Sequence, residues 1–236
     1  VPLDVDSAIT VMPGAIGGEG NITVYGNAED LWVFSIYDAG LTSVDVSDLV
    51  NVTCLGLGGN ELTEIDLSNN LKIDELTLSD NPMSTVDVSM LENLEYFVIS
   101  RCEFESVDVS KNAKLGSLYV SGNPMKSLDV SNNPELWDLQ CGSCGLETLD
   151  VSHNPKMIQI MCDNNNLTQL DISACPDMRY LRCHDNYLTI GTLPLFHPIV
   201  STSYIYAPQK PLPMPDTVGG VDFSAGYDCE GFISRY

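Results

Sequence analysis

The apolar positions of this chain recur with a period of 21 residues. Seven copies follow one another without an insertion from Leu41 to Tyr187, and each begins with a large apolar residue. These first residues are Leu41, Leu62, Met83, Phe104, Met125, Leu146 and Leu167. A strict period of this size is typical of a solenoid, a propeller or a repeat array. A propeller blade needs four strands, so a unit this short predicts one solenoid coil per copy.

Each copy contains an apolar–any–apolar alternation, which predicts one short strand with a buried face. The first apolar column is Leu55, Leu76, Phe97, Leu118, Leu139, Ile160 and Leu181. The second is Leu57, Leu78, Ile99, Val120, Cys141, Cys162 and Cys183. Stacked coils place such strands in parallel, about 4.8 Å apart. We expect a right-handed solenoid with one parallel sheet on its concave side, short extended or 3₁₀ segments on its convex side, and caps at both ends.

An asparagine column follows the strand, and it consists of Asn60, Asn81, Asn123, Asn165 and Asn186. A buried asparagine there can hydrogen-bond the loop backbone of its own and neighbouring coils, which satisfies groups that cannot reach water. Cys102 and Cys144 occupy the same column in two other copies.

These columns match L-x-x-L-x-L-x-x-N/C-x-L, so the chain resembles leucine-rich repeat proteins. The L-D-V-S half of each copy is similar to the 21-residue repeats of Bacteroidetes surface proteins and, more distantly, to internalins. The resemblance implies the solenoid fold and a non-catalytic binding role in a cell-surface or secreted bacterial protein. Leucine-rich repeats carry many unrelated binding roles, so the resemblance names no ligand.

We interpret the segments that flank the repeats as caps, because a solenoid otherwise exposes its apolar core at its two ends. Residues 1–40 are interpreted as an N-terminal cap with a partial repeat, and residues 41–187 as the seven repeats. The Pro-rich residues 188–236 are interpreted as a C-terminal cap or the start of a truncated following module.

An unbroken aspartate column lies in the other half of the repeat: Asp45, Asp66, Asp87, Asp108, Asp129, Asp150 and Asp171. A serine follows two residues after each one. Both residue types make local side-chain-to-backbone hydrogen bonds that hold turns. A calcium ladder is the alternative, but calcium needs six to eight oxygens and the Asp-rich nonapeptide of calcium-binding β-rolls is absent. We favour the structural interpretation and predict no metal site.

Charge restricts the partners. The chain has 33 acidic and 10 basic residues, for a formal charge of −23, which disfavours nucleic acid and anionic membranes. No apolar run approaches the roughly 18 residues of a membrane span. We expect an extracellular or cell-surface protein that is a monomer, with no signal peptide or lipid anchor within this chain.

Catalytic chemistry has little support in the sequence. "CGSC" at 141–144 resembles a redox or zinc motif in isolation, but both thiols fall on core columns of the repeat. His153, His184 and His197 share no column, so they predict no metal cluster. We therefore expect no enzyme activity and no cofactor.

The outward positions of the predicted strands form the candidate binding face. The candidate residues on or beside it are Tyr96, Val98, Arg101, Tyr119, Trp137, Met161, Arg179, Tyr180 and Arg182. Protein interfaces favour Tyr, Trp, Met and Arg, although aromatic residues also occur on sheets without a binding role. We predict a protein partner on this face. The alternatives are a glycan stacked on Tyr96, Tyr119 and Trp137, and a purely structural spacer.

The charge of this face changes along the chain. The second copy offers Asp74, Glu75 and Asp80, whereas the seventh offers Arg179, Tyr180, Arg182 and His184. One hypothesis is that an acidic or aromatic partner segment docks at the C-terminal end. The alternative is that Arg182 pairs with Asp163 of the neighbouring coil.

Overall fold

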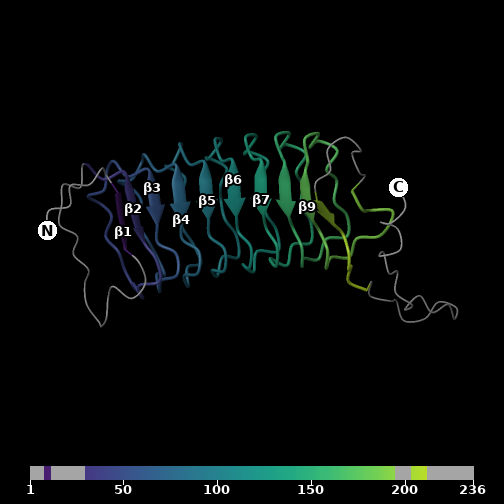
Figure 1. Cartoon of the computed structure of the whole chain (residues 1–236), viewed down its shortest axis with the longest axis horizontal. Coiled ribbons are helices and arrows are strands. Elements are labelled where there is room, and N and C mark those ends of the chain that lie inside the picture. The colour runs from purple at the N-terminus through teal and green to yellow at the C-terminus, as the bar shows by residue number, and fades with distance from the viewer. Residues whose placement is uncertain (1–7, 12–29, 195–202, 212–236) are drawn as a thin grey trace.

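The protein is a stack of coils that share one parallel sheet (Figure 1). The computed structural model describes residues 8–11, 30–194 and 203–211. The strands lie in chain order, each hydrogen-bonded to the next, which confirms the predicted parallel sheet. They are β1 (Ala8–Val11), β2 (Val33–Ile36), β3 (Cys54–Gly56), β4 (Glu75–Thr77), β5 (Tyr96–Val98), β6 (Ser117–Tyr119), β7 (Asp138–Gln140), β8 (Gln159–Met161), β9 (Tyr180–Arg182) and β10 (Ser203–Ile205).

The register of the repeat strands follows the 21-residue period without a slip. Leu55 pairs with Leu76, Leu76 with Phe97, and so on to Leu181. Each of these strands is three residues long, with its central side chain buried and its two neighbours on the opposite face. A column in the sequence is therefore a straight row in space.

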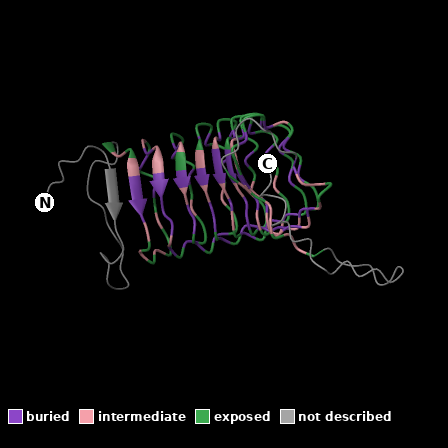
Figure 2. Ribbon diagram, turned by 45° about the vertical axis from the view of Figure 1, so that its right-hand side comes forward, coloured by how far each residue is buried: buried purple, intermediate pink, exposed green. Residues whose placement is uncertain are grey.

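One continuous apolar core runs through the solenoid. Both predicted strand columns are fully buried, including Leu139 at 0% exposure and the three cysteines of the second column. Figure 2 shows the buried segments on the inner sides of the coils and the exposed segments at their turns. The core is continuous because equivalent apolar residues of successive coils pack against one another.

The convex side is built from extended segments and tight turns. In the second repeat, Asn70 N–H donates to the Leu67 carbonyl (3.0 Å) and Ile73 N–H donates to the Asn70 carbonyl (3.2 Å). These i→i+3 bonds recur in all seven repeats. They are 3₁₀-type bonds that do not extend into helix. No described residue belongs to a helix long and apolar enough to cross a membrane.

The predicted asparagine ladder is confirmed. Asn165 Nδ2 donates to the carbonyls of Cys141 and Cys162 (both 2.9 Å), and its Oδ1 accepts from the N–H groups of Cys144 and Leu146 (3.0 and 2.9 Å). Where a cysteine takes the position, its thiol replaces only the donor, as Cys144 Sγ does toward the Val120 carbonyl (3.2 Å). One side chain thus joins two coils.

A second ladder lies on the convex side. It is formed by Asn70, Asn112, Asn133 and Asn154, all fully buried. Each donates through Nδ2 to two backbone carbonyls of the preceding coil or coils, at 2.9–3.0 Å. It was missed at the level of sequence because leucine or cysteine interrupts the column at Leu49, Leu91 and Cys175.

Candidate functional site

The concave face consists of the outward side chains of the strands and of the residues just before them. Tyr96, Val98, Tyr119, Met161 and Arg182 lie on strands and are partly buried. Trp137 and Arg179 immediately precede β7 and β9 and are exposed, as is Tyr180 on β9. Strand geometry therefore brings these eight predicted residues to one surface. Arg101 lies elsewhere, in the turn after β5.

An aromatic and hydrogen-bonded network fixes the centre of this face. The rings of Tyr96 and Tyr119 meet edge to face, with centroids 5.3 Å apart. The Tyr119 hydroxyl donates to Asp138 Oδ2 (2.6 Å), and Gln159 Nε2 donates to Asp138 Oδ1 (2.9 Å). Burial and the Asp138 carboxylate raise the pKa of Tyr119, which keeps the hydroxyl protonated as a donor. The contacts tie β5, β6, β7 and β8 together.

Two glycines make room for rings that lie across a neighbouring strand. A Cβ on Gly116 would stand 2.9 Å from Nε1 of Trp137, and a Cβ on Gly56 would collide with the Tyr37 hydroxyl. The missing side chains let both rings pack against the backbone of an adjacent coil. Trp137 still exposes 45% of its surface, so one side of the indole remains open to solvent.

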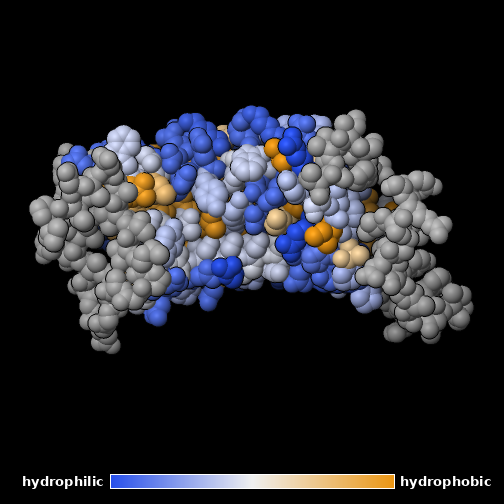
Figure 3. Space-filling view, viewed as in Figure 1, coloured by the Kyte–Doolittle hydropathy of each residue, from blue (hydrophilic) through white to orange (hydrophobic). Residues whose placement is uncertain are grey.

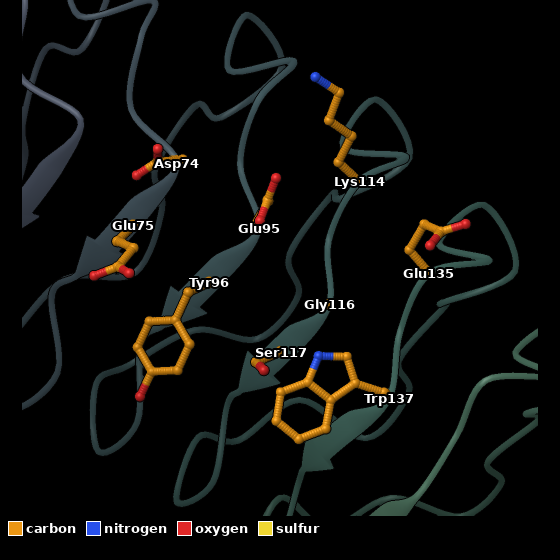
Figure 4. Close-up of a pocket in the computed structure, with 9 residues that line it drawn as sticks. All are labelled: Asp74, Glu75, Glu95, Tyr96, Lys114, Gly116, Ser117, Glu135 and Trp137. Atoms are coloured by element: carbon orange, nitrogen blue, oxygen red, sulfur yellow. The ribbon is translucent and has the colours of Figure 1, made fainter. Parts of the chain in front are cut away.

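A hollow of about 540 Å³ opens beside Trp137, before and at the start of β4, β5, β6 and β7 (Figure 4). We call it the aromatic–acidic groove. It is lined by Asp74, Glu75, Glu95, Tyr96, Lys114, Gly116, Ser117, Glu135 and Trp137. Tyr96 and Trp137 were among the predicted site residues, and Asp74 and Glu75 were named as acidic residues of the same face, whereas the remaining positions carry no interface signal when each is considered alone.

The groove concentrates negative charge. Asp74, Glu75 and Glu95 form no ion pair with a basic side chain of the described residues. Burial, followed by the charges of Glu75 and Glu95, raises the pKa of Asp74. Burial and Glu75 also raise the pKa of the neighbouring Cys54 thiol to about 11.

The two remaining charged residues of the groove, Lys114 and Glu135, are each paired with a side chain of a neighbouring coil. Lys114 Nζ donates to Asn93 Oδ1 (2.7 Å), and Glu135 forms an ion pair with Lys156. These contacts hold the Lys114 ammonium beside Asn93 and balance the charge of Glu135. Asn93 is neutral, so the Lys114 ammonium keeps its charge, but the carboxylates of Asp74, Glu75 and Glu95 outnumber it and the groove stays acidic.

Two arginines among the predicted site residues, Arg182 and Arg101, form ion pairs within the chain. Arg182 Nη2 lies 3.1 Å from Asp163 Oδ2, which is the intramolecular pairing foreseen as the alternative. His184 contacts both Asp163 and Asp185. Arg101, at a φ of 55°, forms a two-point ion pair with Asp80 at 2.5 and 2.6 Å. Carboxylates of the same chain thus offset the charge of Arg182 at the C-terminal end of the sheet and of Arg101 in the third repeat.

The aspartate column is a set of repeated turn braces. In every repeat, Oδ1 of the aspartate accepts from the N–H of the serine two residues later, at 2.8–3.0 Å. These bonds lower the pKa of each of the seven carboxyls. The structural interpretation is confirmed. Among the described residues, no group of three or more His, Cys, Asp or Glu side chains is arranged to hold a metal ion.

The two thiols of the CGSC segment are core residues. Cys141 and Cys144 are both buried, and burial raises the pKa of each, which opposes formation of a reactive thiolate. Cys162 and Cys183 continue the row of Cys141 along the inside of the sheet. His197 and Cys229 lie outside the described residues.

In the view of Figure 3, apolar residues appear as small separate patches among polar ones. This surface is unlike the extended apolar patch of an obligate interface. The side chains of the concave face instead offer aromatic rings, hydroxyl groups and carboxylates, which suit recognition of a partly polar partner.

No protein-family model and no curated protein matches the sequence, but solved structures do. The functional domain of InlJ from Listeria monocytogenes, which includes a cysteine ladder, matches at a TM-score of 0.67 and 29% identity, over 71% of this chain and 38% of that one. Internalin C2 from the same species matches at 0.61 and 21%, over 70% and 77%.

A more distant match is a structure of the Toll–Spatzle complex from Drosophila, at a TM-score of 0.52 and 19% identity, over 68% of this chain and 27% of that one. In the InlJ comparison, the matched part of this chain spans well under half the length of the InlJ structure. Its parallel sheet, its asparagine ladder and these matches establish a leucine-rich repeat solenoid similar to internalin-type proteins of Listeria.

Proposed function

We propose that this chain is a non-catalytic module of a cell-surface or secreted bacterial protein, and that it binds a protein partner through its concave face. The observation that carries the proposal is the network linking Tyr96, Tyr119 and Asp138 across adjacent strands. It holds aromatic rings rigid beside an open hollow before any partner arrives. A preorganised surface loses little side-chain entropy on binding, which favours affinity.

Residue chemistry supports the same surface. Trp137 and Tyr180 are the most exposed aromatic residues of the described repeats, at 45% and 42%. Rings of this kind are the usual energetic anchors of protein interfaces. The InlJ and internalin structures share the fold and are similar to the chain over about 70% of its length.

The flanks are proposed to act as caps. Pairing of β2 with β3 and of β10 with β9 extends the sheet beyond both ends of the seven repeats. Such strands cover apolar edges that end repeats otherwise expose. This proposal keeps 1–40 and 188–236 as separate units from the repeats at 41–187.

The test removes exposed side chains from one face at a time. Trp137→Ala/Tyr180→Ala alters the concave face, and Val50→Ala/Met90→Ala removes two exposed apolar side chains outside the strands as a matched control. A partner isolated with the wild-type protein is then titrated against all three proteins. We expect at least tenfold weaker binding for the concave variant only. Equal loss in both variants would place the interface elsewhere.

A glycan is the second candidate, favoured by open rings beside carboxylates in the aromatic–acidic groove. The same three proteins distinguish it on a glycan array. Saturable binding to one oligosaccharide class that is lost with Trp137→Ala, and unaffected by Val50→Ala/Met90→Ala, would replace the protein partner as the ligand.

A further inference from the structure

The aromatic–acidic groove has two kinds of wall. On one side stand Asp74, Glu75 and Glu95, where burial and then the charges of Glu75 and Glu95 raise the pKa of Asp74. The other wall is the indole of Trp137 (Figure 4). Because none of these three carboxylates forms an ion pair with a basic side chain of the described residues, a cation that enters the groove relieves their mutual repulsion.

The residues that form the floor of the groove, between the rings of Tyr96 and Trp137, have small side chains. Ser117 and Gly116, on and just before β6, lie between Tyr96 of β5 and Trp137, which immediately precedes β7 (Figure 4). Neither floor residue has a long side chain, and Ser117 is buried. Two flanking aromatic rings over a low floor form a slot that admits a flat group, which can then lie against an aromatic face.

We propose that this groove is a subsite for an arginine side chain presented by the partner protein. The guanidinium lies against the exposed face of Trp137 and donates to the carboxylate of Glu95, and Asp74 and Glu75 add negative charge farther along the groove. This assignment rests on the proposed function, and it adds the chemistry of the partner: an extended segment with a basic residue, drawn to the acidic side of the concave face.

Arginine fits this slot better than the alternatives. Its guanidinium is planar, so it stacks on an indole while its fork of donors reaches a carboxylate. A lysine ammonium reaches a carboxylate but cannot stack. An acidic segment would meet three carboxylates, and Arg182, at the end of the sheet where such a segment was expected, already pairs with Asp163. The groove is also larger than one side chain, which leaves space for the neighbouring backbone.

The experiment uses Trp137 as its own reporter. The chain has two tryptophans, so Trp32→Phe leaves Trp137 as the sole indole. This protein is titrated with a capped Gly-Ser peptide that carries one arginine, and with the same peptide carrying citrulline, which is flat but uncharged. We expect a saturable change in Trp137 fluorescence with arginine and at least tenfold weaker binding with citrulline. A lysine peptide should bind with intermediate affinity.

Two charge variants test the carboxylates. Asp74→Asn/Glu95→Gln should weaken the arginine peptide at least tenfold. Glu64→Gln/Glu105→Gln removes the same number of charges from exposed positions outside the groove and should change binding less than twofold. Thermal unfolding of each variant shows whether it remains folded. Equal binding of arginine and citrulline peptides, or equal effects of the two charge variants, would overturn the proposal.

The experiments distinguish a failure of the arginine subsite from a failure of the proposed protein-binding function. If the isolated partner loses affinity with Trp137→Ala/Tyr180→Ala but not with Asp74→Asn/Glu95→Gln, the concave face binds protein and the arginine subsite is wrong. If neutral oligosaccharides change Trp137 fluorescence and arginine peptides do not, the groove binds sugar and both ideas fail. No saturable response to the arginine peptide would likewise reject the subsite.

Discussion

The indole of Trp137 lies against the backbone of Gly116, one coil earlier, in a space that a side chain on Gly116 would occupy. This relationship sets one wall of the aromatic–acidic groove. It joins residues 21 positions apart, so it depends on the stacking of coils and not on the sequence next to either residue.

Gly116→Ala tests this relationship. The new Cβ would stand 2.9 Å from Nε1 of Trp137, so the indole must move outward into solvent. The indole is already exposed, and the loss of stability should be under about 1 kcal/mol, as for other surface changes. Fluorescence of a Trp32→Phe background should shift to longer wavelength. Gly191→Ala, with no close neighbour, is the control, and an unchanged spectrum in Gly116→Ala would contradict the prediction.

The asparagine ladder predicts a graded response at Asn165. Asn165→Ala leaves the Cys141 and Cys162 carbonyls and the Leu146 N–H without this partner inside the protein. We expect a loss of more than about 2 kcal/mol in the free energy of unfolding, since each unmade buried hydrogen bond costs about 1–3 kcal/mol. Asn165→Cys should cost less, because Cys144 serves as a donor at the equivalent position. Urea unfolding that ranks the two variants the other way would refute this.

The core columns predict a large effect at Leu139. Leu139→Ala should lower the free energy of unfolding by about 2–5 kcal/mol, as buried leucine deletions do. Leu71→Ala is a matched control because Leu71 is an exposed leucine, and it should cost less than about 0.5 kcal/mol. Chemical denaturation of both variants measures the difference. Similar costs would mean that the strand column does not face the core.

The aspartate braces predict acid sensitivity. The serine hydrogen bonds hold the folded-state pKa of each aspartate below its unfolded value, which is about 3.9. Their contribution to stability is therefore complete above about pH 4 and is lost as pH falls through the lowered folded pKa. We expect the melting temperature to drop below about pH 4, and Asp129→Ala to reduce the size of that drop.

Calcium provides an independent check on the same column. The carboxylates already accept hydrogen bonds within the turns and offer too few free oxygens for calcium. Millimolar calcium should therefore change the melting temperature at neutral pH by less than about one degree, relative to the same protein in chelator. A calcium-dependent rise that disappears in Asp108→Asn/Asp129→Asn would instead show that the column holds cations.

Much of the fold follows from the period of the sequence. Because coils of equal length stack in register, a column such as that of Leu139 becomes a straight buried row, and the column of Asn165 becomes a ladder along the backbone. The outward direction of Tyr96 and Tyr119 follows from strand alternation in the same way. These features depend only on local periodicity and on the need to bury apolar groups.

The candidate site depended instead on contacts between coils. Whether Arg182 pointed to a partner or to Asp163, and whether Trp137 stood upright or lay across Gly116, was open in the sequence. Each outcome depends on residues about 21 positions apart, which meet only when the coils stack: an ion pair in the first case and close packing in the second. The hollow beside Asp74 and Glu95 exists because small residues on β6 separate larger ones on its neighbours. Shape and charge of this kind arise only when the coils are stacked.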